Sequence, residues 1–336
     1  MNDLIKKLSL LVTVFCMLTL GSIPAMADTL LKLWTGAPGS THYTILTTMA
    51  NAAQAAHPDL RFEVSAGKPA TRTTLAVAKG DVQFCFMVPD ITAWLKEGKR
   101  MFKPVKNHAK LASNLRAAFM YRGGYMQFVA YADSGIKSFS DLRGKKLFIG
   151  PKRAALNNIF RRMLQSATGM KAGVDYKTVA LDWRSGQQAF QDNQVDFTMT
   201  SDLLPSATIQ QFTIGNKIRI IGVSDDDFAK PDVKKLFTSY SRSEEFIPAD
   251  IYGKNQANRA PTRTIGFWAG VGVNKNVPDE VVYKVVKAFW ENIGSMRQAV
   301  AWASAIKRED VFTGLDVPLH PGAARYYREV GMNPPM

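Results

Sequence analysis

Short apolar runs alternate with helix-length segments in two successive series along this chain of 336 residues. In the first series we predict strands at residues 31–34, 60–64 and 82–87, and helices at residues 41–56, 70–78 and 89–95. In the second series we predict strands at residues 126–131, 146–149, 176–180, 195–199 and 218–221, and helices at residues 154–168, 184–191 and 204–212. A parallel sheet covered by helices requires alternation of this kind. The sequence therefore predicts an α/β fold with two lobes.

The remainder of the chain lacks a strand series of its own. Residues 231–263 mix acidic and aromatic residues without a clear period, which indicates a loop-rich excursion over the second lobe. A strand-like run at residues 264–273 follows, and then an amphipathic helix from Pro278 to about Ile293. The economical arrangement has these C-terminal helices wrapping the first lobe.

This arrangement makes the chain cross between the lobes twice, near Met126 and near Thr264. We predict that residues 28–124 and 265–336 form the first lobe and that residues 125–264 form the second. Two crossings make a hinge beside an interlobe cleft, and closure around a ligand is a common use of such a cleft.

The N-terminus has the pattern of a cleaved signal peptide at residues 1–27. Lys6 and Lys7 precede an apolar stretch at residues 8–20, and small residues end the pattern at Ala27. The alternative is an uncleaved anchor, but the apolar stretch is shorter than the roughly 20 residues that a spanning helix needs. We expect a periplasmic protein whose mature chain begins at Asp28.

Charge and cysteine content narrow the choice of partners. The formal net charge of +15 favours anionic partners, yet the basic residues are spread along the chain, so we predict no nucleic-acid partner. Membrane headgroups and cell-wall polyanions compete with small carboxylates as that partner.

Only Cys85 follows the signal peptide, and its apolar surroundings indicate a buried side chain without a disulfide.

The first predicted strand leads through a turn of small residues into a helix. Gly36, Gly39, Ser40 and Thr41 allow backbone N–H groups to approach a ligand, and the helix N-terminus adds unpaired N–H groups and a positive dipole end. The turn therefore predicts an anion cradle. The competing interpretation is a simple connector, which is what most turns of this kind are.

Four segments resemble the TAXI-type extracytoplasmic solute receptors, the substrate-binding components of certain tripartite (TRAP) transporters. The glycine-containing loop at residues 35–43 is similar to the first loop of that family, and the Gly-Asp pattern at residues 79–84 is similar to its next motif. Residues 133–147, followed by Gly150 and Pro151, match the start of the second lobe. Residues 319–327 resemble the C-terminal signature, the most specific of the four.

The resemblance implies a type II periplasmic-binding-protein fold. It also implies a receptor that captures a small carboxylate, such as a glutamate-like compound, for a TRAP permease in the membrane. We expect the receptor to be a monomer. No catalysis and no cofactor are expected. This chain has Lys152 and Arg153 where the family commonly has small residues, and Thr200, Ser201 and Asp202 where a small apolar loop is usual.

The candidate ligand-binding residues lie in loops at the predicted strand ends, where ligands of α/β folds gather. The first loop contributes Thr35, Gly36, Ala37, Gly39, Ser40, Thr41 and Tyr43. The later loops contribute Ala66, Gly67, Lys68, Pro89, Asp90, Lys152, Arg153, Ser201 and Asp202.

The charged candidates suggest two kinds of ligand. Arg153 is the expected partner of a ligand carboxylate, with a solvated loop residue as the alternative. Asp90 and Asp202 would suit an ammonium group, although aspartate at a helix start is more often a cap. With all three in the cleft the site suits a zwitterion, and with Arg153 alone it suits a simple carboxylate. Trp183 is a candidate for an apolar wall.

The sequence gives weaker support for a metal site, for phosphate binding by a glycine-rich loop and for catalysis. The four histidines lack metal-ligand spacing, so we predict no metal, and no phosphate-binding loop or nucleophile elbow occurs in the sequence. An exported enzyme that uses Asp90, Asp202 or Lys152 remains an alternative, because a fold alone does not exclude catalysis. A binding protein of an ATP-driven importer is another alternative.

Overall fold

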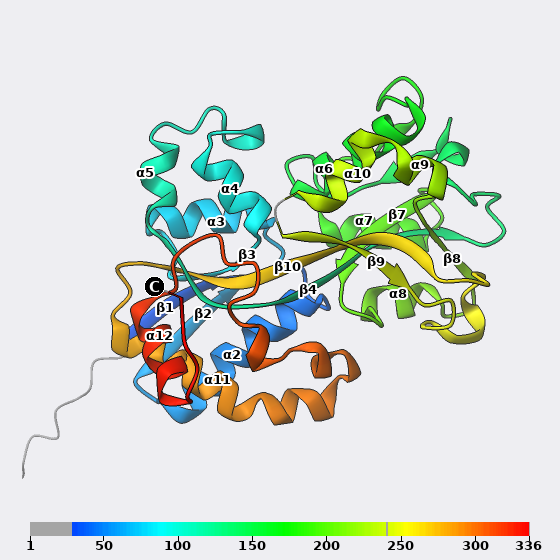
Figure 1. The fold of residues 1–336 in the computed structure, drawn as a ribbon. Coiled ribbons are helices and arrows are strands. Elements are labelled where there is room, and N and C mark those ends of the chain that lie inside the picture. Colours follow the sequence, from blue (N-terminus) through cyan, green and yellow to red (C-terminus); the bar gives the residue numbers. More distant parts are fainter. Residues whose placement is uncertain (1–28, 240, 336) are drawn as a thin grey trace, which may run out of the picture.

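The computed structural model describes residues 29–239 and 241–335. The strands form one ten-stranded sheet in the order β2-β1-β3-β10-β4-β7-β5-β6, in which β8 also pairs with β4 and β9 with β10. Helices lie on both faces of the sheet, as the sequence predicts (Figure 1). The predicted signal peptide at residues 1–27 lies outside the described residues.

We refer to the elements before β4 and after β10 as the first lobe, and to the elements between β4 and β10 as the second lobe. The parallel strands of the first lobe are β1 (Thr29–Trp34), β2 (Leu60–Ser65) and β3 (Phe84–Met87). Its N-terminal helices are α2 (Thr41–Ala56), α3 (Ala70–Lys79), α4 (Pro89–Lys96), η1 (Arg100–Phe102) and α5 (His108–Ala112). Its C-terminal helices are α11 (Asp279–Ala299), η4 (Ala301–Ala305), η5 (Arg308–Asp310) and α12 (Pro321–Glu329). In Figure 1, α2, α11 and α12 lie below the strands and α3, α4 and α5 above them.

The second lobe lies at the other end of the sheet. Its strands are β5 (Lys146–Phe148), β6 (Lys177–Thr178), β7 (Phe197–Asp202), β8 (Ile218–Ile221) and β9 (Arg242–Ile247). Its helices are η2 (Phe139–Leu142), α6 (Ala155–Thr168), α7 (Trp183–Gln191), α8 (Ala207–Phe212), α9 (Asp225–Ala229), α10 (Pro231–Thr238) and η3 (Gly253–Asn255). Strands β5, β6 and β7 are parallel.

Two long antiparallel strands, β4 (Leu115–Tyr131) and β10 (Thr262–Asn274), connect the lobes. In the first lobe β10 pairs with β3, and in the second lobe β4 pairs with β7 and β8. The Thr264 hydroxyl donates a hydrogen bond to the Met126 carbonyl, which ties the two strands together in the second lobe. Figure 1 shows both strands running from one lobe into the other.

A register shift interrupts this strand pair where the lobes meet. Phe267 pairs with Gly124 and Trp268 pairs with Arg122, so Gly123 has no partner opposite it. Gly124 has φ +129°, and a Cβ there would lie 2.4 Å from the Asp202 carbonyl carbon. The junction therefore needs glycine both for its backbone angle and for the close approach of β7.

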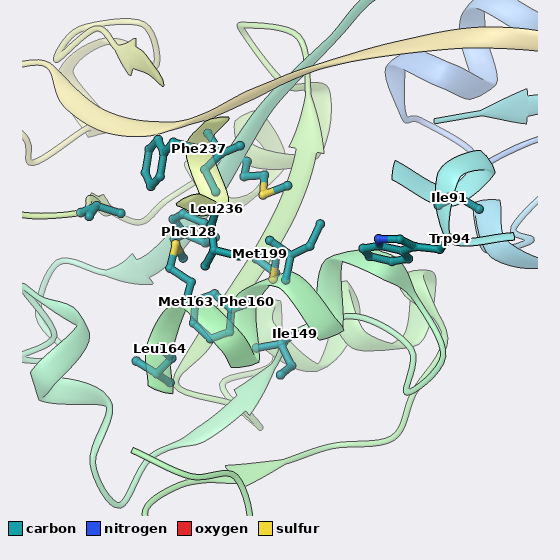
Figure 2. Packing of buried hydrophobic residues seen from close by; sticks show 14 of the residues in the cluster. Ile91, Trp94, Phe128, Ile149, Phe160, Met163, Leu164, Met199, Leu236 and Phe237 are labelled. Carbon is teal, nitrogen blue, oxygen red and sulfur yellow. The ribbon is translucent and has the colours of Figure 1, made fainter. Parts of the chain in front are cut away.

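Three clusters of buried side chains fill the interior. One cluster packs α2 and α11 against the first lobe, where the rings of Phe119 and Phe289 stack at 4.8 Å. A smaller cluster packs α7 and α8 against the second lobe. The third cluster includes residues of α4 and of α6 and therefore spans both lobes. Figure 2 shows Ile91 and Trp94 of α4 together with Phe160 and Met199 of this shared cluster.

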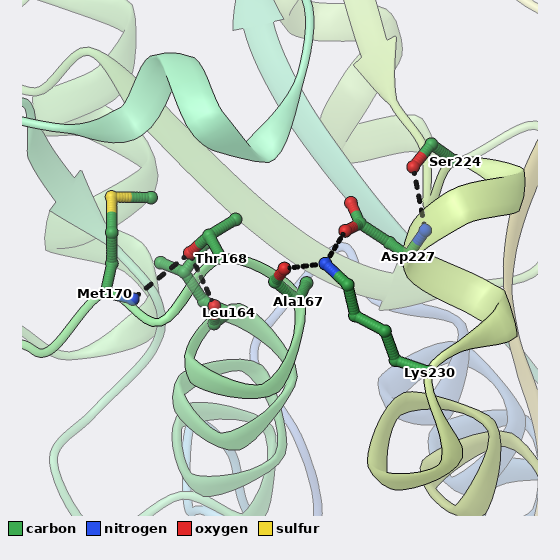
Figure 3. Close-up of polar contacts among 7 residues, drawn as sticks. All are labelled: Leu164, Ala167, Thr168, Met170, Ser224, Asp227 and Lys230. Atoms are coloured by element: carbon green, nitrogen blue, oxygen red, sulfur yellow. Dashed lines mark hydrogen bonds and ion pairs between the residues drawn. The ribbon is translucent and has the colours of Figure 1, made fainter.

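Polar contacts attach α9 and α10 to the end of α6. The Lys230 ammonium donates to the Ala167 carbonyl and lies 2.7 Å from an Asp227 carboxylate oxygen (Figure 3). The Ser224 hydroxyl caps α9 by accepting from the Asp227 N–H at 3.1 Å. Segment 225–238 is thus held on the second lobe beside α6.

Three features differ from the sequence-based predictions. Strand β7 starts at Phe197 and continues through Asp202, so Ser201 and Asp202 lie at the end of the strand and not in a loop after Met199. Strand β4 begins at Leu115 and not at Met126, because the glycine pair that resembles a strand end is a bulge inside one continuous strand. Residues 231–263 contain helix α10 and strand β9 and are not merely a loop. The sequence of β9 is highly charged because it is a partly exposed edge strand that, among the described strands, pairs with β10 alone.

We predict that Gly124→Ala destabilises the protein by about 3 kcal/mol or more, since alanine adds both a strained backbone angle and a clash with the Asp202 backbone. Gly135→Ala is the matched control, because Gly135 has φ +79° and open space around its Cβ position. This control should lose only about 1 kcal/mol. Denaturant unfolding measures both losses, and equal losses would contradict the role given to the junction.

Candidate functional site

A cavity of about 100 Å³ lies between the two lobes. The first lobe contributes the loops after β1, β2 and β3, and the second lobe contributes the start of α6, part of α7 and the end of β7. Met126 of β4 and Phe267 of β10 also line it. The cavity is therefore placed where the carboxyl ends of parallel strands from both lobes converge, as ligand sites in α/β folds usually are.

The predicted anion cradle at the start of α2 is filled by the protein itself. The Thr41 N–H donates to Asp202 Oδ1 at 3.1 Å, and the Tyr43 N–H donates to the Ser40 hydroxyl at 3.2 Å. The carboxylate of Asp202 thus takes the position at a helix N-terminus that the sequence suggested for a ligand anion. Because Asp202 belongs to the second lobe, this hydrogen bond also joins the two lobes.

Asp202 is almost fully enclosed, with 2% of its surface exposed. Its Oδ2 accepts hydrogen bonds from the hydroxyls of Thr200 and Ser206, each at 2.9 Å. Burial raises the pKa of Asp202, and the hydrogen bonds from Thr41, Ser206 and Thr200 oppose that rise. A second contact beside it, from the Leu203 N–H to the Thr41 hydroxyl at 3.1 Å, strengthens the junction.

The loops after β1 and β2 are also bonded to each other. The Gly67 N–H donates to the Gly36 carbonyl at 2.8 Å, and the Lys68 N–H donates to the Thr35 carbonyl at 3.2 Å. A backbone cradle at residues 66–68 was expected from the small residues there. These N–H groups are instead used within the protein, which leaves the side chain of Lys68 as the contribution of this loop to the cavity.

Lys68 is the one lysine or arginine among the described residues that line the cavity. Its ammonium lies 5.9 Å from the centre of the Trp34 ring, and within residues 29–239 and 241–335 it forms no ion pair with a carboxylate. Its side chain is half-buried. Lys68 is therefore the cation available to an anion in the cavity.

Asp90 faces the cavity but has a cation of its own. Its carboxylate lies 3.0 Å from Arg242 Nε, and both side chains are almost fully buried. Burial raises the pKa of Asp90 to about 6, against the opposing effect of Arg242. Asp316 lies nearby, accepts a hydrogen bond from the Thr92 hydroxyl, and has a pKa raised to about 7 by burial and by Asp90.

The loop before α6 contributes backbone and small side chains to the cavity. Lys152 and Arg153 are exposed and lie outside the lining, whereas Ala154, Ala155 and Leu156 are part of it. The turn ends at Ala154, the N-cap of α6, so the lining begins directly after the two basic residues. The Arg153 carbonyl accepts a hydrogen bond from the Thr71 hydroxyl of the first lobe at 3.2 Å.

His42 lines the cavity as a neutral side chain. It stacks on Phe86 with ring centres 3.9 Å apart, and its Nδ1 lies 3.0 Å from the Tyr121 hydroxyl. Burial lowers the pKa of His42 to about 3, and a contact with the Ser201 backbone opposes this only in part. At neutral pH the stacked pair therefore presents an uncharged surface.

The structure brings together fewer than half of the predicted site residues. Those that line the cavity are Gly36, Ala37, Ser40, Lys68, Asp90, Ser201 and Asp202. Those outside the lining are Thr35, Gly39, Thr41, Tyr43, Ala66, Gly67, Pro89, Lys152 and Arg153. Thr35 and Thr41 are buried and hold the loops in place, through bonds to the His42 carbonyl and to Leu203 respectively.

Sequence reasoning missed most of the apolar lining. The missed residues are His42, Pro69, Ala70, Phe86, Val88, Ile91, Met126, Ala154, Ala155, Leu156, Ile159, Gln187, Thr200 and Phe267. Trp183, considered as an apolar wall, does lie there. A signal was present in the apolar residues directly at strand ends, such as Phe86 and Val88, but such residues are hard to tell from core residues by pattern alone.

The described residues offer neither a cluster of metal ligands nor a membrane-spanning helix. Within the described residues, no group of three or more histidine, cysteine or acidic side chains is arranged to hold a metal ion. No described helix combines the length and the apolar character needed to cross a membrane.

Residues 33–331 match the NMT1-like family, and the protein therefore belongs to that family. The structure is similar to one described as a periplasmic transporter, with a TM-score of 0.54, 14% sequence identity, and coverage of 92% of this chain and 94% of that chain. This likeness confirms the predicted periplasmic-binding-protein-like α/β fold.

Two further structures overlap with this one. A protein from Bordetella bronchiseptica RB50 gives a TM-score of 0.51 at 15% identity, covering 89% of this chain and 82% of that chain. An extracytoplasmic solute receptor from Bordetella pertussis, described as binding pyroglutamic acid, gives a TM-score of 0.45 at 13% identity and covers 90% of this chain and 92% of that chain. At 15% identity the likeness to the Bordetella bronchiseptica protein concerns the fold alone.

We predict that Asp202→Asn lowers the free energy of unfolding by about 1–3 kcal/mol. The amide replaces one acceptor oxygen with an NH₂ group among three donors that all point at the side chain. Asp81→Asn, which removes the same charge from an exposed position, is the control and should cost less than about 0.5 kcal/mol. Chemical denaturation measures both, and a neutral Asp202→Asn would refute the proposed junction.

We also predict that Arg242→Leu lowers the free energy of unfolding, and that this decrease becomes larger from pH 5 to pH 8. Without Arg242 the pKa of Asp90 should rise further above about 6. Between the pKa of Asp90 in the unfolded state and its higher pKa in the folded state, the folded protein holds a proton on Asp90 that the unfolded chain has lost. The free energy of unfolding therefore falls as pH rises through this range. Asp316, Lys96 and Arg162 also act on this cluster.

The matched control is Arg259→Leu, at an exposed position, which should show no such dependence on pH. The double variant Arg242→Leu with Asp90→Asn should lose most of the increase, because the titrating carboxyl is gone. Urea unfolding of all variants at pH 5, 6.5 and 8 provides the measurement. A loss from Arg242→Leu that stays constant across these pH values would contradict the assignment to Asp90.

Proposed function

We propose that this member of the NMT1-like family is an extracytoplasmic receptor that captures a small anionic or zwitterionic solute. The observation that carries the proposal is the cavity between the lobes, with Lys68 as its cation. The likeness to a structure described as a periplasmic transporter supports the same class of function. The pattern of a signal peptide at residues 1–27 supports a periplasmic location.

Binding is proposed to involve hinge motion at β4 and β10, with the two lobes divided near residues 124 and 265. In the present arrangement the lobes are joined across the cavity by Asp202 with Thr41 and by Thr71 with the Arg153 carbonyl. Such contacts are available only when the lobes lie close together. The structure thus has the features of a closed state. An open state would leave the strands intact, but it would break these hydrogen bonds and the buried Asp90–Arg242 ion pair, which also joins the lobes, and it would separate the α4 and α6 side chains of the shared cluster.

Delivery to a TRAP-type permease is proposed from the resemblance of residues 319–327. Here this segment begins α12, where buried His320 accepts a hydrogen bond from the Gly322 N–H at 3.2 Å. Its Leu319 forms a bridge with Ala117 of β4. The segment therefore secures the C-terminal helix against a strand that reaches the second lobe.

Binding without turnover is favoured over catalysis because Asp90 and Asp202, the acidic side chains at the cavity, are already engaged by other groups of the protein. Asp90 is paired with Arg242, and Asp202 accepts three hydrogen bonds. Lys152, the remaining candidate for catalysis, is exposed outside the cavity. A general acid or base needs a free atom within hydrogen-bond reach of the reacting atoms. Asp90 and Asp202 line the cavity but are engaged by protein partners, and Lys152 lies outside the lining.

The test is thermal unfolding of the purified protein with mono- and dicarboxylates, amino acids, sulfonates and phosphates. A ligand at 100 times its dissociation constant adds about 2.7 kcal/mol to the stability of the folded state. We expect at least one small organic anion to stabilise the wild-type protein and to lose most of this effect in Lys68→Ala.

Arg153→Ala is the matched control, because Arg153 is an exposed cation near the same cavity but outside its lining. It should bind like the wild type. Loss of binding in Arg153→Ala with retention in Lys68→Ala would reverse this assignment. A panel without any stabilising compound, repeated after denaturation and refolding to remove co-purified ligand, would overturn the receptor proposal for these solute classes.

A further inference from the structure

We infer that the cavity selects a small monoanion with an apolar body and discriminates against a zwitterion such as glutamate. The inference rests on the proposed receptor function and narrows its ligand class. It follows from four properties of the cavity: its apolar walls, its engaged carboxylates, the position of its cation, and its size.

Apolar side chains from both lobes make up the walls. Phe86, Val88 and Ile91 contribute from the first lobe. Leu156, Ile159 and Trp183 contribute from the second lobe. A polar group on the body of a ligand would have to lose its water against these side chains without gaining a hydrogen bond, which costs several-fold in affinity per group. The walls therefore favour a hydrocarbon body.

Two of the walls are held rigidly. The Trp183 ring packs edge-on against Phe148 at 5.7 Å, and a Cβ at Gly150 would lie 2.6 Å from that ring. On the other lobe, Phe86 stacks on neutral His42 at 3.9 Å. Rigid aromatic walls retain their apolar surface without rearranging for a polar ligand.

The carboxylates that might recognise an ammonium group are already engaged. Asp90 lies 3.0 Å from Arg242 Nε in a buried ion pair. Asp202 accepts from Thr41, Thr200 and Ser206 with both of its oxygens. An ammonium group entering the cavity would be desolvated without an acceptor carboxylate, unless it broke one of these contacts. The cavity therefore penalises a zwitterion.

Positive potential is concentrated at one end of the cavity. Lys68 lies directly before α3, whose N-cap Pro69 makes no side-chain capping bond. From the second lobe α6 begins at the lining residues Ala154 and Ala155, also without a side-chain cap. The first-turn N–H groups of both helices add to the field of the Lys68 ammonium. An anionic head is accommodated there, with its body against the apolar walls.

The volume of about 100 Å³ limits the body. An apolar cavity of roughly 150 Å³ holds a benzene molecule, so the body that fits here is smaller than benzene, about four or five carbon atoms, as in an isopentyl chain. The head is a carboxylate or a sulfonate, since both present the same charge to Lys68.

Three matched compounds test this inference by isothermal titration of purified protein that has been denatured and refolded to remove bound solute. The compounds are 4-methylpentanoate, L-leucine, which adds only an ammonium group, and 4-methylpentanamide, which lacks the charge. We expect 4-methylpentanoate to bind at least tenfold more tightly than either of the others. L-Glutamate should bind more weakly still, and 3-methylbutane-1-sulfonate distinguishes the two kinds of head.

Lys68→Ala should lower the affinity for 4-methylpentanoate to that for its amide and leave the affinity for the amide unchanged, whereas loss of structure would lower both affinities. If Lys68→Ala does not fold, Lys68→Gln, which keeps more of the side chain, takes its place in the experiment. Arg153→Ala is the control and should keep the preference for 4-methylpentanoate over its amide.

The outcomes separate the two proposals. If L-leucine or L-glutamate binds as tightly as 4-methylpentanoate, or more tightly, the inference is wrong and the receptor function stands. If none of these compounds binds while another solute class in the thermal panel does, the inference of an apolar monoanion as ligand is again wrong and the receptor function stands. If neither assay finds a ligand, both proposals are overturned.

Discussion

The pairing of β4 with β10 is the constraint on which the rest of the structure depends. These two strands belong to both lobes, so every element of the first lobe is positioned relative to the second through them. The bulge at Gly123 and the close approach of Gly124 to Asp202 lie where the lobes meet. A bulge adds local twist and bending to a strand pair. This one lies beside the interlobe cavity, which Phe267 of β10 lines.

The carboxylate of Asp202 then decides the electrostatic character of that cavity. By occupying the N-terminus of α2 it neutralises the most obvious anion site of the first lobe and binds the lobes together. The Asp90–Arg242 pair similarly balances a second charge beside the cavity. A protein of formal charge +15 thus has one unpaired basic side chain, Lys68, among the described cavity-lining residues. The net charge of the chain is therefore a poor guide to the field inside its site, because local pairs dominate at short range.

Much of the fold follows from local patterns. Helix α2 begins and ends at the predicted residues, and the boundaries of β8 are also those predicted, because a capping serine and the apolar run set them locally. Strands β4 and β9 were harder to predict. The glycine pair in β4 has the local appearance of a strand end, and β9 carries charge because it is an edge strand. Both become regular only through their pairing with β10.

The sequence by itself determined the two α/β series, the loops at strand ends and the supply of polar residues in those loops, because period and turn chemistry act over a few neighbouring residues. Only the tertiary structure decided which of those residues meet. Lys68 reaches the cavity while Arg153 faces solvent, although both are basic residues just before a helix. Asp202 and Thr41, separated by 161 positions, form a hydrogen bond in place of a ligand contact. Such choices depend on how the two lobes pack, and no local pattern encodes the partner that packing brings to a given side chain.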